Sequence, residues 1–220
     1  MRTEPAPTGR TAAEDFTAQI VAAAEACDSD LVIVGKYGAR TPQPRVLAGA
    51  ALRAARARGL PLLLLVGSPR GPARRLLAAI DESPDAAPIL AWARMLATRL
   101  GAPVELVCVV SEALLGAVGV AAGESERRRA ARGLRDAAKR WLDAHASKLR
   151  DVGVNVTTWS PAGDPATEIV RAAERTDADL ILIGRHGAGR LADALLGSTA
   201  RRVLRETARP VLLVPEAGAS

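Results

Sequence analysis

The chain has 220 residues, of which 49% are apolar, and a formal net charge of +6. This length suits one complete domain plus a fragment. Two cysteines are too few for a disulfide framework, and no apolar run approaches the roughly 20 residues that span a bilayer, so neither a disulfide scaffold nor a membrane protein is expected. Aromatic residues are scarce, which predicts a core of Leu, Val, Ile and Ala, as in buried parallel strands.

The excess of basic residues raises the question of a nucleic-acid partner. Most of these residues alternate with acids along predicted helical faces, and there are too few aromatic side chains to stack on bases. We therefore expect solvated helix faces in preference to a nucleic-acid partner, with a patch that binds a polyanion as the alternative. Residues 1–15 lack the apolar core of a signal peptide, and two free thiols fit a reducing compartment, so a cytoplasmic location is predicted.

An internal repeat organises the chain. Residues 20–64 align without a gap with residues 169–213, and many aligned positions are identical, as in Asp28-Ser29-Asp30-Leu31 against Asp177-Ala178-Asp179-Leu180. Each copy predicts a helix, a strand, a glycine loop, a second helix and a last strand. The first copy lacks the upstream strands that precede the second.

The predicted elements follow one another as strand and helix. Upstream of the second copy are strands at 75–80 and 103–110, helices at 85–100 and 124–149, and a strand at 154–159. The second copy itself adds helices at 165–175 and 198–205 and strands at 180–183 and 211–214. Five strands alternating with helices indicate an α/β fold with a doubly wound parallel sheet. We assign residues 1–70 to a truncated, degenerate repeat and 71–220 to a complete domain.

The fourth strand of the complete domain leads into a glycine loop. Gly184-Arg185-His186-Gly187 follows the strand, and Gly197-Ser198-Thr199 begins the next helix. Glycines let the backbone approach a ligand, and the amides at the positive end of a helix attract anions, so the pattern suits a phosphate cradle. It is neither a Walker A loop nor a dinucleotide fingerprint. On these residues alone, ordinary loop and helix-cap glycines remain the alternative.

Several motifs together resemble the universal stress protein family. The spacing Gly-x2-Gly-x9-Gly-Ser/Thr after a fourth strand is the ATP-binding pattern of that family. Similar too are the first strand ending at 79–83, the run at 178–187 and the final Arg-Pro-Val-Leu-Leu-Val-Pro at 209–215. The resemblance covers residues 74–216 and implies a five-stranded parallel sheet with strand order 3-2-1-4-5.

The resemblance implies an ATP site formed by ten residues, with Mg²⁺ accompanying the phosphates. Those near the adenine or ribose would be Ala79, Asp81, Val109, Ile183 and Gly184. Those near the phosphates would be Gly187, Gly197, Ser198 and Thr199, with His186 in a ligand-contact role. The carboxyl ends of strands in an open α/β sheet are where ligands bind, so topology favours the same edge.

Other interpretations compete for some of these residues. Asp81 could instead cap the turn that follows it. His186 would need a partner to act as a base, and the sequence places none beside it, so no catalytic residue is predicted. Arg185 and Arg190 flank the loop as phosphate ligands or as ordinary surface arginines.

The predicted function is that of an ATP-binding stress or regulatory module, in which occupancy changes conformation or association. The alternatives are a scaffold of the same family that binds no nucleotide, or a weak ATPase with slow hydrolysis or autophosphorylation. In the first copy Ala48-Gly49-Ala50 replaces Gly197-Ser198-Thr199, so we expect no nucleotide there. In the family the last strand often pairs with its equivalent in a second domain. We therefore expect 62–66 to pair with 211–214 as an intrachain pseudo-dimer, with a homodimer as the alternative.

Overall fold

The computed structural model describes residues 12–35, 44–66, 71–111, 124–187 and 196–216. The helices are α1 (Ala12–Ala26), α2 (Pro44–Ala57), α3 (Ala86–Leu100), α5 (Glu124–Arg150), α6 (Pro165–Arg175) and α7 (Ser198–Glu206). The strands are β1 (Val32–Gly35), β2 (Leu62–Leu65), β3 (Leu76–Ala79), β4 (Val104–Val107), β5 (Val110–Ser111), β6 (Val156–Trp159), β7 (Ala162–Gly163), β8 (Leu180–Gly184) and β9 (Val211–Val214).

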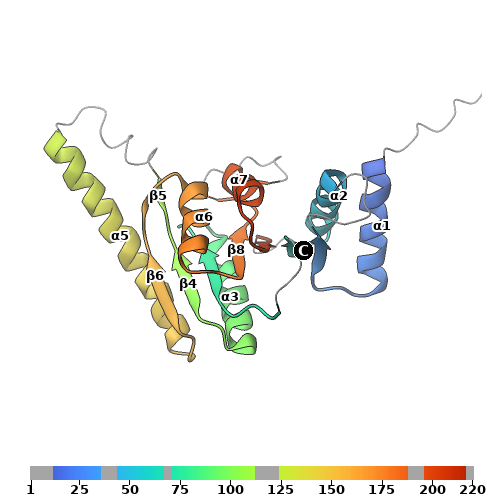
Figure 1. Ribbon diagram of the computed structural model, residues 1–220, viewed down its shortest axis with the longest axis horizontal. Helices are drawn as coiled ribbons and strands as arrows, with labels where there is room; N and C mark the ends of the chain where they lie inside the picture. Colours follow the sequence, from blue (N-terminus) through green and yellow to red (C-terminus); the bar gives the residue numbers. More distant parts are fainter. Residues whose placement is uncertain (1–11, 36–43, 67–70, 112–123, 188–195, 217–220) are drawn as a thin grey trace, which may run out of the picture.

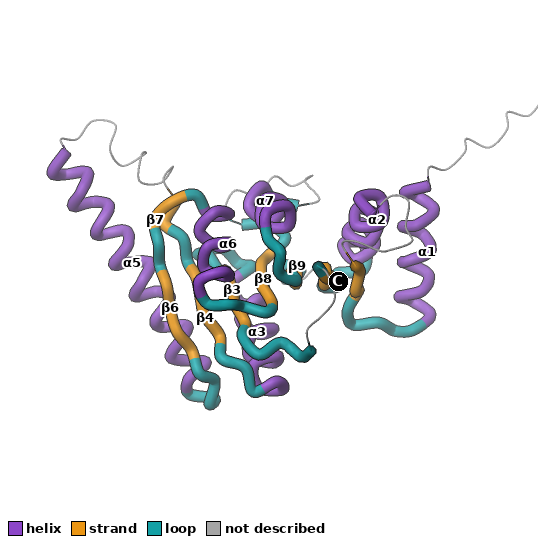
Figure 2. Tube along the Cα trace, in the orientation of Figure 1, coloured by secondary structure: helices purple, strands orange, loops and turns teal. Residues whose placement is uncertain are grey.

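Seven strands form one sheet in the order β1-β2-β9-β8-β3-β4-β6. The strands from β3 onward in this sheet pair in parallel, and β6, β4, β3, β8 and β9 follow one another across Figure 2. Their order along the sheet is 3-2-1-4-5 when these five are numbered along the chain. The predicted α/β class with a mostly parallel sheet is confirmed.

Two apolar cores lie on opposite faces of the sheet. On one face α3 and α5 cover strand residues such as Leu106 and Leu182, and on the other α6 and α7 cover residues such as Leu77 and Ile181. Every residue of β8 is buried, because a central strand of a doubly wound sheet meets helices on both faces. Small alanines on the buried side of α3 and α6 let these helices pack closely.

The segment that precedes β3 joins the sheet through its last strand. β1 pairs in parallel with β2, and β2 runs antiparallel to β9, with Leu62 opposite Leu213 and Leu64 opposite Val211. The helices α1 and α2 pack on each other beside this end of the sheet (Figure 1). The strand pairing predicted between 62–66 and 211–214 is therefore present over Leu62–Leu64. Pairing removes the exposed apolar edge that β9 would otherwise present.

The second strand of the complete sheet is shorter than predicted. It ends at Val107 instead of continuing to residue 110, and a separate two-stranded ladder joins β5 to β7. The Ser160 hydroxyl donates to the Cys108 carbonyl, and Pro161, which has no N–H, accepts from the amide of Val110. The pairing of β4 with β6 therefore does not continue into that of β5 with β7, because Pro161 between them has no N–H to donate.

The described helices include none that is long and apolar enough to cross a bilayer.

Candidate functional site

A cavity of about 560 Å³ lies at the carboxyl ends of the parallel strands. All ten residues singled out from the sequence line it: Ala79, Asp81, Val109, Ile183, Gly184, His186, Gly187, Gly197, Ser198 and Thr199. The ends of β3 and β8, the segment after β4 and the start of α7 thus meet at one place. A cavity of this size at this edge suits a small-molecule ligand.

The Asp81 carboxylate lies directly against the glycine loop. A Cβ atom built on Gly187 would stand 2.8 Å from Asp81 Oδ2, which is closer than real Cβ contacts allow. A side chain at residue 187 would therefore displace the carboxylate. Asp81 Oδ1 also accepts a hydrogen bond from the Ser83 amide at 3.1 Å, so the turn-capping role holds as well. One oxygen fixes the turn while the other faces the loop.

The N-terminus of α7 opens into the cavity without a side-chain cap. Its N-cap residue is Gly197, whose amide donates to the Arg185 carbonyl at 2.7 Å. The amides of Ser198 and Thr199 find no acceptor within the part of the chain that the structure describes. A Cβ on Gly197 would approach the Arg185 carbonyl and His186 Cα at 3.3 Å, so glycine lets the helix start close to the loop. Unpartnered amides at a helix start are a binding site for an anion.

Arg185 does not take either of the roles expected from the sequence. Its side chain is 3% exposed and donates to the carbonyl of Leu60, ahead of β2. Burial, with a smaller contribution from the charge of Arg56, lowers the pKa of the Arg185 guanidinium to about 10, so it stays charged at neutral pH. Arg185 is thus neither a phosphate ligand nor a surface residue. It ties the glycine loop to the segment before β3. Arg190 lies outside the described residues.

His186 has a carboxylate partner that the sequence did not reveal. Its Nδ1 lies 2.8 Å from Oε1 of Glu216, which follows β9. The contact joins the loop after β8 to the segment after β9 and fixes the orientation of the imidazole that lines the cavity. Thirty residues separate the partners, and no local pattern relates them.

Cys108 lines the cavity but is not a nucleophile at neutral pH. Burial and the nearby charges of Asp81 and Glu82 raise the pKa of its thiol to about 11. The thiolate is the reactive form, so Cys108 contributes a small apolar surface. Both cysteines are unpaired, Cys27 being exposed and Cys108 buried.

Helices that the sequence analysis did not connect with the site complete its walls. These cavity residues are Ile89 of α3, Leu134, Ala137 and Ala138 of α5, and Pro165 and Ile169 of α6. They form an apolar wall next to Val109 and Ile183. The sequence analysis did not predict which end of each of these helices lies over a cavity. No group of three or more potential metal-binding side chains occurs in the described ranges.

The fold and the site define a class of protein. It is a doubly wound α/β domain with a ligand cavity between its first and fourth strands and an uncapped helix N-terminus at one end of that cavity. Residues 72–215 match the universal stress protein family. That match covers more than half of the chain, and the chain belongs to this family.

Curated relatives share part of this region. Universal stress protein MJ0577 of Methanocaldococcus jannaschii is 37% identical over 81 residues, which is 37% of this chain and 50% of the relative. A universal stress protein of Mycolicibacterium smegmatis is 38% identical over 78 residues, which is 35% of this chain and 58% of the relative. The chain thus matches about half the length of these relatives.

Solved structures agree with the fold. The structure of the hypothetical protein MJ0577 superposes with a TM-score of 0.59 and 29% identity, covering 66% of this chain and 96% of that one. A universal stress protein from Archaeoglobus fulgidus gives a TM-score of 0.64 at 19% identity and covers 93% of this chain and 66% of that one. At that identity the second match shows the fold alone.

Proposed function

We propose that this chain binds one adenine nucleotide, ATP, in the cavity at the carboxyl ends of β3 and β8, and that occupancy controls its conformation or association. The observation that carries the proposal is the uncapped start of α7. Ser198 and Thr199 line the same cavity as Asp81 and Val109, and α7 has no side-chain cap at its start. An anionic group, a polyol and an aromatic base would each meet a matching surface.

Each part of the nucleotide has a suitable neighbour. The adenine fits the apolar end, where Val109, Ile183 and the side chains of α5 lie together. The ribose hydroxyls suit Asp81, since a carboxylate accepts their hydrogen bonds. The phosphates suit Gly187 and the start of α7, where amides and hydroxyls donate. Mg²⁺ would be held by the phosphates.

The segment before β3 has a different proposed role. We assign residues 1–70 to an incomplete repeat that binds no nucleotide and 71–220 to the nucleotide-binding domain. The antiparallel pairing of β2 with β9 supports an intrachain pseudo-dimer at the sheet edge that a homodimer would otherwise use. The two unpaired cysteines support a reducing, cytoplasmic setting.

Calorimetric titration of MgATP into the full chain tests the proposal. We expect one nucleotide per chain, and no measurable binding to Gly187→Val, because the new side chain would occupy the space of the Asp81 carboxylate. Gly133→Val is the matched control, since a Cβ on Gly133 of α5 meets nothing within 4 Å. Absence of binding to the wild type would reject the proposal in favour of a scaffold that binds no nucleotide.

A further inference from the structure

The positive charge of this protein is concentrated on one helix. Of its 30 basic and 24 acidic residues, α5 holds nine basic and four acidic ones in 27 residues. The rest of the chain, with 21 basic and 20 acidic residues, is nearly neutral. The expectation that basic residues alternate with acids along helical faces therefore does not describe α5.

The basic half of α5 is mostly exposed, although Leu134 within it packs against the core and lines the cavity. Its first buried residue is Ala138, and the fourteen positions before it include none that is buried among those described. Figure 1 shows this half of α5 extending beyond the ends of β4 and β6. The exposed side chains of Arg128, Arg132, Arg135 and Lys139 recur at the spacing of one helical side. At 1.5 Å per residue the whole helix is about 40 Å long.

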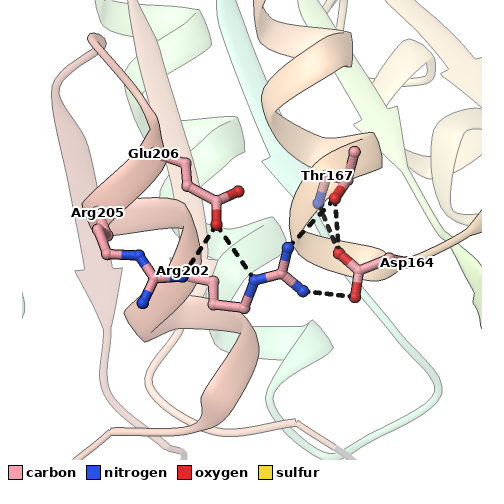
Figure 3. A network of polar contacts seen from close by, with 5 residues as sticks. All are labelled: Asp164, Thr167, Arg202, Arg205 and Glu206. Carbon is pink, nitrogen blue, oxygen red and sulfur yellow. Dashed lines mark hydrogen bonds and ion pairs between the residues drawn. The ribbon is translucent and has the colours of Figure 1, made fainter.

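Most of these arginines lack acidic partners. Arg128 pairs with Glu124 and Lys139 with Asp143, but Arg129, Arg132, Arg135 and Arg140 form no ion pair with a residue inside the described ranges. On α7 the situation is the reverse. Figure 3 shows Arg202 held between Glu206 and Asp164, with Arg205 on the same Glu206. Two arginines of α7 thus have acidic partners, whereas those four arginines of α5 have none in the described part of the chain.

We propose that the exposed face of α5 binds the phosphate backbone of duplex DNA without reading its sequence. A guanidinium binds phosphate in a bidentate manner, and arginines without acidic partners gain free energy by releasing the counterions of the duplex. The exposed part of α5 from Glu124 to Arg140 is about 24 Å long, which is most of one turn of B-form DNA, about 34 Å. Several phosphates can thus be contacted at once.

The side chains of α5 argue against other acidic partners. A protein partner or a membrane needs apolar anchors, and the large exposed apolar residues among those described are Ile33, Leu100 and Val152, none of them on α5. Single-stranded nucleic acid needs exposed aromatic rings for stacking. Trp141 is half-buried and packs edge-to-face against His145, with their ring centres 4.6 Å apart, so it does not serve this purpose.

Binding of a labelled DNA duplex of about 24 base pairs to the full chain at about 50 and 200 mM salt tests this proposal. We expect binding that weakens steeply with salt. The triple variant Arg129→Gln, Arg132→Gln and Arg135→Gln should bind at least roughly tenfold more weakly at low salt. It should also lower the slope of log K against log salt by about 2.7, or 0.9 for each lost contact. Glutamine keeps the helix because its helix propensity is high.

The matched control removes the same charge elsewhere. Arg74→Gln, Arg94→Gln and Arg99→Gln together change three exposed arginines outside α5. We expect less than a roughly threefold loss of binding and an unchanged salt slope. Equal losses in the two triple variants, or no binding by the wild type at low salt, would overturn the proposal. Binding of polyglutamate or of single-stranded DNA as tight as that of the duplex would overturn the choice of partner. None of these readouts depends on ATP.

Discussion

Helices α6 and α7 pack side by side on one face of the sheet, yet their N-termini are built differently. The start of α6 is capped by the chain itself, because Asp164 Oδ1 accepts from the Thr167 amide at 3.0 Å. The start of α7 has Gly197 at the same position and no side-chain cap. An aspartate at the N-cap supplies the helix with its own anion, whereas a glycine leaves the amides for an external one.

The comparison also explains the polar network between the two helices. Arg202 of α7 reaches Asp164 at 2.7 Å, so the carboxylate that caps α6 is held in place by a side chain of α7 (Figure 3). The hydrogen bond from the Thr167 amide and the charge of Arg202 lower the pKa of Asp164. The internal cap is therefore part of the packing, while the start of α7 lies in the cavity.

The largest effect is expected from giving α7 the cap that α6 has. Gly197→Asp would place a carboxylate at the amides of Thr199 and Ala200 and repel phosphate, so ATP affinity should fall at least about 100-fold. Gly197→Ala adds the same Cβ crowding without the charge, and calorimetry should show a much smaller loss. Equal affinities for the two variants would mean that α7 does not hold the phosphates.

A second prediction concerns the residue that holds the loop before α7. Arg185→Met removes the hydrogen bond that the buried guanidinium donates to the Leu60 carbonyl, which should cost about 1–3 kcal/mol. Because Arg185 bridges to the segment before β3, hydrogen exchange should quicken at the amides of β1 and β2 more than at those of α6. Uniform loss of protection along the whole sheet would contradict a local role for this side chain.

A third prediction concerns the Asp164 cap of α6, whose removal should change stability and not ligand binding. Asp164→Ala should lower the free energy of unfolding by about 1 kcal/mol, as loss of an N-cap does, with ATP affinity unchanged. Denaturant unfolding and calorimetry on the same sample separate the two quantities. A weakened ATP affinity with normal stability would place the ligand at α6 instead of α7.

The lowered pKa of Asp164 predicts that the free energy of unfolding depends on pH. Its folded-state pKa is lowered, so the ionised form favours the folded state. The stabilisation is complete above the ordinary aspartate pKa of about 4 and is lost as the pH falls below it. The free energies of unfolding of the wild type and of Asp164→Asn should therefore differ at pH 7 and become equal in acid. A difference that stays constant down to low pH would exclude the ionised carboxylate of Asp164 as its source.

The smallest effect is expected at the apolar end of the cavity. With a thiol pKa of about 11, Cys108 should resist alkylation at pH 8, while the exposed Cys27 reacts. Mass spectrometry of the alkylated chain gives both extents in one experiment, and Cys27→Ser provides the control. Rapid modification of Cys108 in the folded protein would show that this wall of the cavity is open to solvent.

Much of this arrangement could be predicted because it is local in the sequence. The buried strands are short apolar runs, and the bounds of α6 and β9 follow from the proline and the apolar residues at their starts. The glycine loop and the start of α7 lie within sixteen residues of each other, so their spacing already predicted a cradle. The residues of the glycine loop and of the start of α7 line the cavity for this reason, whereas Ala79, Asp81 and Val109 lie far from them in the sequence and were expected from the family resemblance.

The features that the sequence did not predict depend on contacts between residues that are far apart in the chain. Arg185 meets Leu60, 125 positions away, and its direction is set by the pairing of β2 with β9. Glu216 reaches His186 because two parallel strands end together, and no motif records that meeting.

The most direct test of the account follows the backbone amides themselves. In a ¹⁵N-labelled sample titrated with MgATP, the account predicts large chemical-shift changes at Gly187, Ser198 and Thr199 and little change at Thr167, whose amide is already bound to Asp164. Saturation at one nucleotide per chain would complete the result. Shifts confined to other parts of the chain, or none at all, would contradict the claim that the uncapped start of α7 is the phosphate site.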